Sequence, residues 1–176
     1  MNADQLLQFL NLNYNYHRAS ALAKDHIVNS PWKEWLITEV AIAFANSGTP
    51  WKSKLHAPYM LNHQNSIDTN WARYSTSEIP SVKVVDEVTQ ASRCDLLLEK
   101  QSGERAYIEF VCINQQEKQA FFYAWGQFLA RLSKIQSLKS VNPYLNIIAI
   151  LATHGSMSQA HKLYNTLPGK VDIYTW

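Results

Sequence analysis

Residues 94–113, CDLLLEKQSGERAYIEFVCI, decide the fold that this sequence predicts. Two mainly apolar runs, residues 94–99 and 106–113, have the length and composition of strands buried within a sheet. Gly103 lies in the polar connection between these runs, where it suits the turn of a β-hairpin. We therefore expect two neighbouring antiparallel strands.

Each of these strands carries one carboxylate among apolar residues, Asp95 in the first and Glu109 in the second. A buried carboxylate without a partner is unfavourable, so it needs a cation, a metal ion or exposure at the end of the sheet. On adjacent strands the two carboxylates can lie side by side, an arrangement that suits Mg²⁺. The alternative is that Asp95 or Glu109 forms an ion pair with Arg93 or Arg105.

The segments around the hairpin alternate between helical and strand patterns. Residues 3–29 have a helical pattern that polar residues 11–16 can divide into two helices. Residues 49–80 are polar without a clear period, which is consistent with a surface excursion or a small hairpin. The other expected elements are a helix at 32–45, a strand at 82–88, a helix at 115–139, a strand at 146–152, a helix at 156–167 and a strand at 171–176.

This order predicts an α/β fold. The expected sheet is mixed: a three-stranded meander built from 82–88, 94–99 and 106–113, joined by crossover strands and flanked by helices. Residues 1–30 form an N-terminal helical extension, and 32–176 form the core, with 49–80 as a polar insert. The 176 residues fit one domain.

Composition narrows the class of protein. Hydrophobic residues make up 47% of the chain and charged residues 17%, which favours a packed core over disorder. The net charge of +2 does not by itself indicate nucleic-acid binding. Cys94 and Cys112 belong to no metal-binding cluster and are expected to be free thiols in a reducing compartment. Without a signal peptide or a membrane-spanning run, we expect a cytoplasmic protein with no membrane partner.

The two carboxylates and the order of the elements resemble the PD-(D/E)XK (restriction-endonuclease-like) nuclease superfamily. In that family an Asp and a (D/E)-x-K tripeptide bind the metal and position the attacking water, on a core of one helix, three strands, a helix and a strand. The resemblance covers about residues 32–152, and residues 93–98 resemble the family's strand entry. It implies that Asp95 and Glu109 are catalytic metal ligands, with Mg²⁺ or Mn²⁺ as the cofactor.

Two further site residues follow from the resemblance. Many members carry a Glu on the helix before the sheet; Glu39 lies on an apolar stripe of that helix, whereas Glu34 lies in its first turn, where the helix dipole explains it. Some members place a Gln on the helix after the third strand. Gln127 is the preferred candidate, since the neighbouring Gly126 would allow close approach to the sheet, and Gln119 in a QxxxY match is the other. The simpler interpretation of these side chains is an ion pair or a solvated helix face.

The sequence departs from the family at its lysine. The third residue of the tripeptide is Val111, which can neither orient water nor stabilise negative charge. Either the lysine has migrated, with Lys118 and Lys100 as candidates, or catalysis is lost.

Basic residues are candidates for phosphate contacts, and in the insert they alternate with aromatic residues that can stack on bases. The simpler interpretation is that the aromatics form a small satellite core and the lysines are solvated. The predicted nucleic-acid-binding residues are Arg93, Lys118, Arg131, Lys52 and Lys54.

Three functions remain open. The favoured one is a nuclease-like protein with impaired catalysis, which binds DNA or RNA or serves as a subunit of a DNA-processing or defence complex. The second is an active Mg²⁺-dependent endonuclease with a migrated lysine, such as a restriction, repair or mobile-element enzyme. The third is a protein-interaction or immunity module on the same fold.

Overall fold

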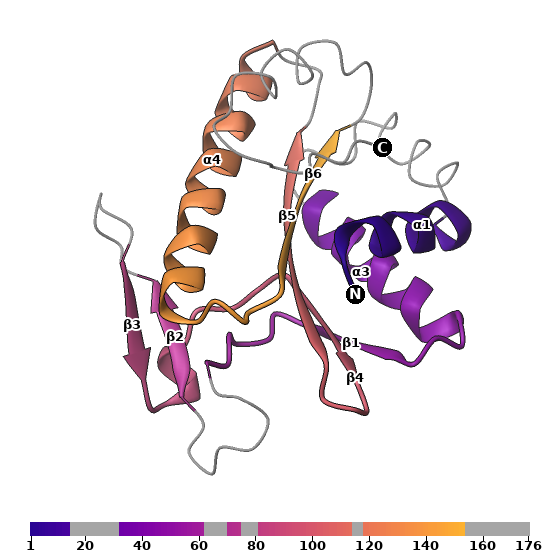
Figure 1. Ribbon diagram of the computed structural model, residues 1–176. Helices are drawn as coiled ribbons and strands as arrows, with labels where there is room; N and C mark the ends of the chain where they lie inside the picture. Colours follow the sequence, from indigo (N-terminus) through magenta and orange to yellow (C-terminus); the bar gives the residue numbers. More distant parts are fainter. Residues whose placement is uncertain (15–31, 62–69, 75–80, 114–117, 154–176) are drawn as a thin grey trace.

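The computed structural model describes residues 1–14, 32–61, 70–74, 81–113 and 118–153. Its elements follow the chain in the order helix, helix, three strands, a short 3₁₀ helix, two strands, helix and strand (Figure 1). They are α1 (Ala3–Asn13), α3 (Trp32–Asn46), β1 (Trp51–Leu55), β2 (Trp71–Tyr74), β3 (Val82–Val85), η1 (Val88–Gln90), β4 (Leu96–Lys100), β5 (Arg105–Ile113), α4 (Lys118–Val141) and β6 (Ile147–Thr153).

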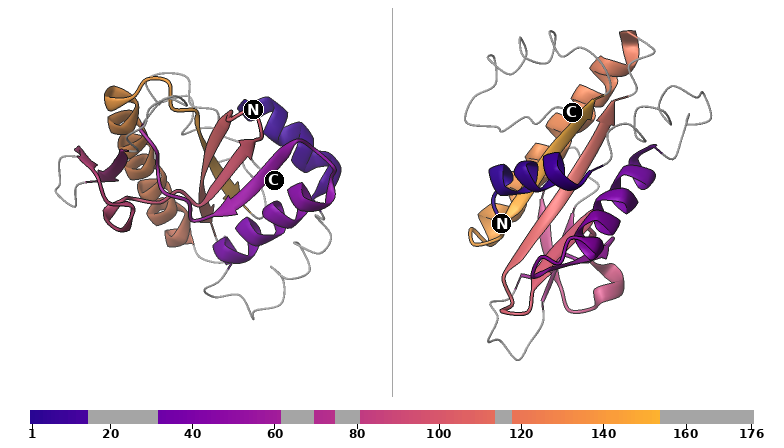
Figure 2. Two further views of the ribbon diagram at one scale, coloured as in Figure 1. Left: turned by 90° about the horizontal axis from the view of Figure 1, so that it is seen from below. Right: turned by 90° about the vertical axis from the view of Figure 1, so that its right-hand side faces the viewer.

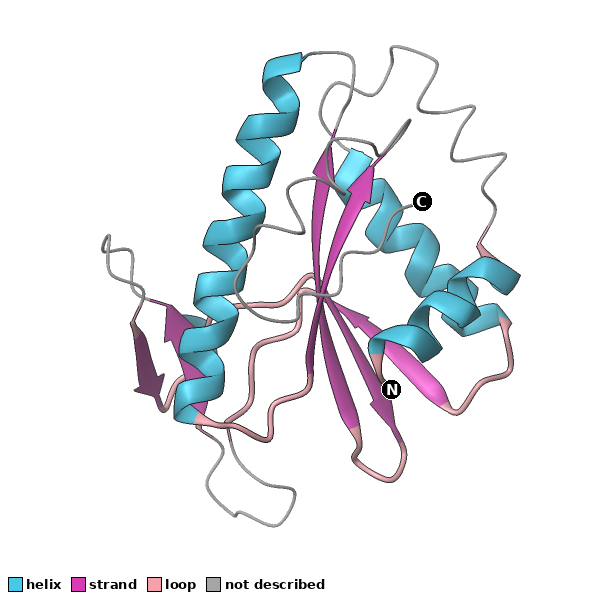
Figure 3. Cartoon of the chain, turned by 45° about the horizontal axis from the view of Figure 1, so that its top comes forward, coloured by secondary structure: helices cyan, strands magenta, loops and turns pink. Residues whose placement is uncertain are grey.

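A four-stranded mixed sheet forms the centre of the molecule. Its strands lie in the order β1-β4-β5-β6, with antiparallel pairing from β1 to β5 and parallel pairing between β5 and β6. Helices α1 and α3 lie on one side of this sheet and α4 lies on the other (Figures 1 and 3). In the right-hand view of Figure 2, α1 crosses in front of β5 and β6, and α3 runs beside them. The α/β class and the mixed, helix-flanked sheet predicted from the sequence are confirmed.

Burial on both faces explains why the central strands are almost continuously apolar. Alternate residues of β5, including Ile108 and Phe110, pack in a core with α1 and α3. Tyr107, on the opposite face, packs in a second core with residues of α4. The Phe9 and Phe44 rings join α1 to α3 in a stack with centroids 3.9 Å apart.

The first strand of the meander differs from the prediction. It is β1, within the segment expected to be a surface excursion or a hairpin, and it pairs with β4 from Trp51 opposite Lys100 to Leu55 opposite Leu96. Residues 82–85 instead form β3, which pairs with β2 in a separate two-stranded sheet. The pattern was misleading because β1 is an edge strand. Lys52 and Lys54 protect such an edge from further pairing, and they obscure its apolar alternation.

The remaining described elements lie close to their predicted positions. Gly103 has a φ of +84° in the turn between β4 and β5, a conformation that is unfavourable for residues other than glycine. α1 begins with a capping box between Asn2 and Gln5 and ends at Asn13, within the predicted break. Residues 15–31, the predicted helix at 156–167 and the predicted strand at 171–176 lie outside the described residues.

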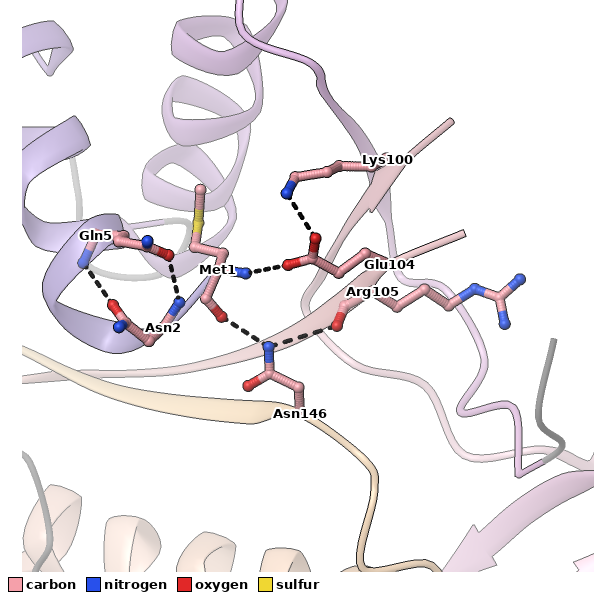
Figure 4. A network of polar contacts seen from close by, with 7 residues as sticks. All are labelled: Met1, Asn2, Gln5, Lys100, Glu104, Arg105 and Asn146. Carbon is pink, nitrogen blue, oxygen red and sulfur yellow. Dashed lines mark hydrogen bonds and ion pairs between the residues drawn. The ribbon is translucent and has the colours of Figure 1, made fainter. Parts of the chain in front are cut away.

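A polar network fastens the start of the chain to the β4–β5 hairpin (Figure 4). The Met1 amino group lies 2.7 Å from Glu104 Oε1, and Lys100 Nζ lies 2.5 Å from Glu104 Oε2. Asn146 Nδ2 donates to the carbonyl oxygens of Met1, at 2.7 Å, and Arg105, at 3.4 Å. These contacts hold α1 against the end of the sheet where β6 begins.

None of the helices within the described ranges combines the length and the apolar character needed to cross a bilayer.

Phe110→Ala tests the core that α1 and α3 form with the sheet. Phe110 is completely buried, so its truncation leaves a cavity and is expected to lower the free energy of unfolding by about 3–5 kcal/mol. The matched strand variant Val84→Ala, at a position that is 53% exposed, should change it by less than about 0.5 kcal/mol. Urea unfolding followed by circular dichroism measures both, and equally small losses would contradict this packing.

Candidate functional site

The pairing of β4 with β5 brings the two predicted carboxylates together. Leu96 lies opposite Ile108, so the same register places Asp95, which directly precedes β4, opposite Glu109. Asp95 Oδ2 also accepts a hydrogen bond of 2.7 Å from the Phe110 amide. This bond ties Asp95 to β5 beside Glu109.

A cation from α3 neutralises Asp95. Lys33 Nζ lies 2.7 Å from Asp95 Oδ1, and both oxygens of this nearly buried carboxylate therefore have a partner. Lys33 lies in the first turn of α3, where the helix dipole disfavours a positive charge. The ion pair with Asp95 offsets this unfavourable position.

Glu109 is completely buried and meets a cation from the other side of the sheet. The Tyr59 hydroxyl donates a short hydrogen bond to Oε1. Arg131 Nη1, from α4, lies 3.1 Å from Oε2. That contact has the distance of an ion pair but not the alignment of a hydrogen bond, so Oε2 accepts none from the described residues.

Burial dominates the electrostatics of this site. It raises the pKa of Glu109 to about 7, with Asp95 acting in the same direction and Arg131, Tyr59 and Lys33 opposing the rise. Burial, followed by the charge of Glu109, raises the pKa of Tyr59 well above its usual value. Tyr59 therefore stays protonated and serves Glu109 as a hydrogen-bond donor.

Aromatic rings close the α4 side of the site. The Tyr59 ring lies 5.0 Å from that of Tyr107 and 5.8 Å from that of Tyr74, measured between centroids. Burial raises the pKa of the nearby Cys94 thiol to about 12, so Cys94 is an unreactive core residue. Cys94 and Cys112 are both free thiols, as the sequence predicts.

Asp95 and Glu109 do form ion pairs, as the alternative predicted, but Arg93 and Arg105 are not their partners. Arg105 Nε lies 2.6 Å from Glu99 Oε1, and Arg93 donates to the His56 carbonyl at 2.8 Å. Lys33 and Arg131 take their places. Lys33 was missed because no local pattern links the start of α3 to β4; its only signal is its unfavourable place in a first helical turn.

The other residues proposed for catalysis lie elsewhere or are not described. Glu39 lines a hollow between the end of α1 and α3, and Glu34 lies 3.1 Å from His56 Nε2. Gln127 is on the exposed side of α4 and hydrogen-bonds neither carboxylate. A Cβ at Gly126 would meet no atom within 4 Å, so this glycine does not serve a close approach to the sheet.

Of the two candidates for a migrated lysine, the structure describes the side chain of Lys100 alone, and it does not contact the carboxylates. Lys100 pairs with Glu104, at the far end of β4 from Asp95. Lys118 lies in the first turn of α4, and its side chain is outside the described residues, as is that of Gln119. Lys33 is the lysine that the structure brings to Asp95.

The predicted phosphate-binding residues are mostly engaged within the protein. Lys54 Nζ lies 2.7 Å from Glu99 Oε2, Arg93 binds the His56 carbonyl, and Arg131 faces Glu109. Lys52 is exposed on β1.

Arg73 is one of the basic residues that the sequence places among aromatics in the insert, and the structure adds Lys83 as its neighbour. Arg73 on β2 and Lys83 on β3 are both exposed and lie directly opposite each other. Like charges in such a cross-strand pair repel.

The donor set does not fit the hydrated metal ion that the resemblance implies. Mg²⁺ retains several water ligands, but Glu109 has no exposed surface and each carboxylate already faces a cation of the protein. Within the described residues, no group of three or more His, Cys, Asp or Glu side chains is arranged to hold a metal ion. The site as it stands is a buried network of two ion pairs.

Comparisons of the chain with known protein families, curated proteins and solved structures found no match. The case for a function therefore depends on the geometry of the site.

Glu109→Gln is expected to gain stability relative to the unmodified protein as the pH rises. Because the pKa of Glu109 is about 7 in the folded protein and 4.5 ordinarily, the folded state keeps a proton that the unfolded chain releases between these values. The contribution of Glu109 to the free energy of unfolding therefore falls across this range, by up to about 3 kcal/mol, whereas Gln does not titrate.

Urea unfolding at about pH 5 and pH 8 measures the difference between the two proteins. Glu104→Gln is the control: Lys100 and the amino terminus lower the pKa of this exposed carboxylate, so its titration lies at or below the acidic end of this range. A constant difference between Glu109→Gln and the unmodified protein would contradict the raised pKa.

Proposed function

We propose that this protein is a nuclease-like protein that binds nucleic acid and hydrolyses phosphodiester bonds poorly or not at all. The observation that carries the proposal is the juxtaposition of Asp95, at the start of β4, with Glu109 on the adjacent β5, and with Val111 two residues beyond Glu109. The order of α3, β1, β4, β5, α4 and β6 supports it, since it is the order of helix, three strands, helix and strand that the resemblance implies.

Impaired hydrolysis follows from the groups around the carboxylates. Val111 is buried on the same strand face as Glu109, where its isopropyl group supplies neither a proton acceptor nor a charge. The oxygens of both carboxylates are directed at Lys33, the Phe110 amide, Tyr59 and Arg131. Loss of one group that positions water or stabilises charge costs on the order of 10²- to 10⁴-fold in rate.

Binding of nucleic acid is supported by the β2–β3 ribbon, the two-stranded sheet beside one end of α4 (Figure 1). Ala72 and Val82 on its inner face pack toward the core that contains Tyr107. Alternation therefore directs Trp71, Arg73 and Lys83 to the outer face. No described carboxylate pairs with Arg73 or Lys83, and a phosphate backbone would offset their repulsion while a base stacks on Trp71.

An active nuclease is the second candidate, and one contact favours it. Lys33 Nζ lies 2.7 Å from Asp95 Oδ1, so an ammonium group does reach the carboxylate pair, though from α3 rather than from β5. In this candidate Lys33 serves as the migrated lysine, in place of Lys118 or Lys100.

A cleavage assay separates the two candidates. The unmodified protein, incubated with labelled single- and double-stranded DNA and RNA in Mg²⁺ or Mn²⁺, is expected to release no more product than Asp95→Asn, because Val111 supplies no catalytic group. Robust cleavage that Asp95→Asn abolishes would overturn impaired hydrolysis.

Lys33→Met and Lys100→Met then identify the lysine. The two side chains are matched, since each is 30% exposed and pairs with a carboxylate. Loss of cleavage in Lys33→Met alone would establish the active candidate.

The ribbon is tested by Arg73→Gln combined with Lys83→Gln. We expect weak, salt-sensitive binding of a labelled single-stranded oligonucleotide by the unmodified protein, measured by fluorescence anisotropy. Losing two phosphate contacts should lower the slope of log affinity against log salt by about 1.4.

Lys100→Gln combined with Lys139→Gln removes the same charge elsewhere and should leave that slope unchanged. Equal effects of the two double variants would show that the ribbon is not the site. Absence of binding to any DNA or RNA at low salt would favour the protein-interaction module instead.

A further inference from the structure

We propose that Lys33 and Arg131 take the place of a divalent cation at Asp95 and Glu109, and that removing Lys33 would let a divalent metal ion bind at Asp95. The inference concerns the carboxylates alone and holds whether or not the protein binds nucleic acid. Failure of the β2–β3 ribbon to bind an oligonucleotide would therefore leave it untouched.

Charge balance is the first argument. The carboxylates of Asp95, directly before β4, and Glu109, on β5, are neighbours, and two cations, one from α3 and one from α4, face them. Lys33 reaches Asp95 from α3, and Arg131 reaches Glu109 from α4. These two helices lie on opposite sides of the sheet (Figure 1). When both carboxylates are ionised, the four charges sum to zero, so the buried pair needs no further cation.

The positions of the cations are the second argument. Lys33 Nζ lies 2.7 Å from Asp95 Oδ1, so a metal ion that ligates this oxygen would have to displace the ammonium group. Glu109 has no exposed surface, and a divalent ion such as Mg²⁺ gives up its water ligands reluctantly. The cations of the protein therefore block a metal ion in two ways: they neutralise the carboxylates, and they contact the oxygens that would ligate it.

The unequal exposure of the two cation sites makes Lys33 the residue to remove. The Lys33 side chain is 30% exposed and that of Asp95 is 10% exposed, whereas the Glu109 side chain is fully enclosed. Truncation of Lys33 thus leaves the partly exposed Asp95 without its cation, while Glu109 keeps Arg131 and Tyr59. An Asp95 carboxylate with an uncompensated negative charge and access to water can ligate Mg²⁺ or Mn²⁺, which bind through one or two carboxylates and keep several water ligands.

The experiment compares Lys33→Ala with the unmodified protein, Lys33→Arg and Lys100→Ala. Thermal unfolding is recorded in EDTA and in millimolar Mn²⁺ or Mg²⁺, and electron paramagnetic resonance counts bound Mn²⁺. In EDTA, Lys33→Ala should melt about 10 °C below the unmodified protein, because Asp95 loses its counter-charge. Mn²⁺ should raise the melting temperature of Lys33→Ala alone by several degrees, with one ion bound. Adding Asp95→Asn to this variant should abolish both the rise and the binding.

Lys33→Arg keeps the charge, and Lys100→Ala breaks an ion pair with Glu104 away from the site, so neither should gain a metal ion. The inference is overturned if the unmodified protein binds Mn²⁺ and loses it on Asp95→Asn, because the carboxylates would then hold a metal with both cations present. It is equally overturned if folded Lys33→Ala binds no Mn²⁺. Should Lys33→Ala fail to fold, Lys33→Gln takes its place, and Mn²⁺ binding by the unmodified protein still decides against the inference.

Discussion

The burial of two carboxylates side by side is the constraint on which the rest of this structure depends. Asp95 directly precedes the central strand β4 and Glu109 lies on the neighbouring β5, where water cannot solvate Glu109 at all. Their charges are tolerable only because the protein supplies a partner for each. The start of α3 must bring Lys33 to Asp95, and the middle of α4 must bring Arg131 to Glu109.

The need to pair these carboxylates fixes how the helices on each side are placed along the sheet, which apolar packing alone would not do. The core shared with α1 and α3 and the core shared with α4 are apolar contacts, which have little directional preference. Ion pairs and the Tyr59 hydrogen bond have defined partners and distances, so they select one position of each helix along the sheet. Removal of either cation would leave an uncompensated buried charge. The resulting loss of stability would be far larger than the stability that the intact ion pair contributes.

The ion pairs of Asp95 and Glu109 also affect whether these carboxylates can hold a catalytic metal ion. A catalytic metal centre needs carboxylate oxygens that face water, whereas the oxygens of Asp95 and Glu109 face donors and cations of the protein. Valine at position 111 fits these surroundings, because a residue buried beside Glu109 can be apolar once Arg131 supplies the charge. The two carboxylates and the valine at position 111 are thus compatible with a site that holds the fold together.

Sequence by itself determined the elements whose periodic patterns are strong. The β4–β5 hairpin, its Gly103 turn, α3, α4 and β6 are local features, and the adjacency of Asp95 and Glu109 follows from the pairing of two consecutive strands. β1 was missed, because an edge strand with lysines on it resembles a polar loop.

Only the tertiary structure decided which cations meet the carboxylates. Lys33 is 62 residues from Asp95 and Arg131 is 22 residues from Glu109, as their numbers in the chain give. No sequence period spans such separations. Partners so distant are chosen when helices and sheet pack, since the low dielectric of the interior makes an unpaired charge costly only once water has been excluded.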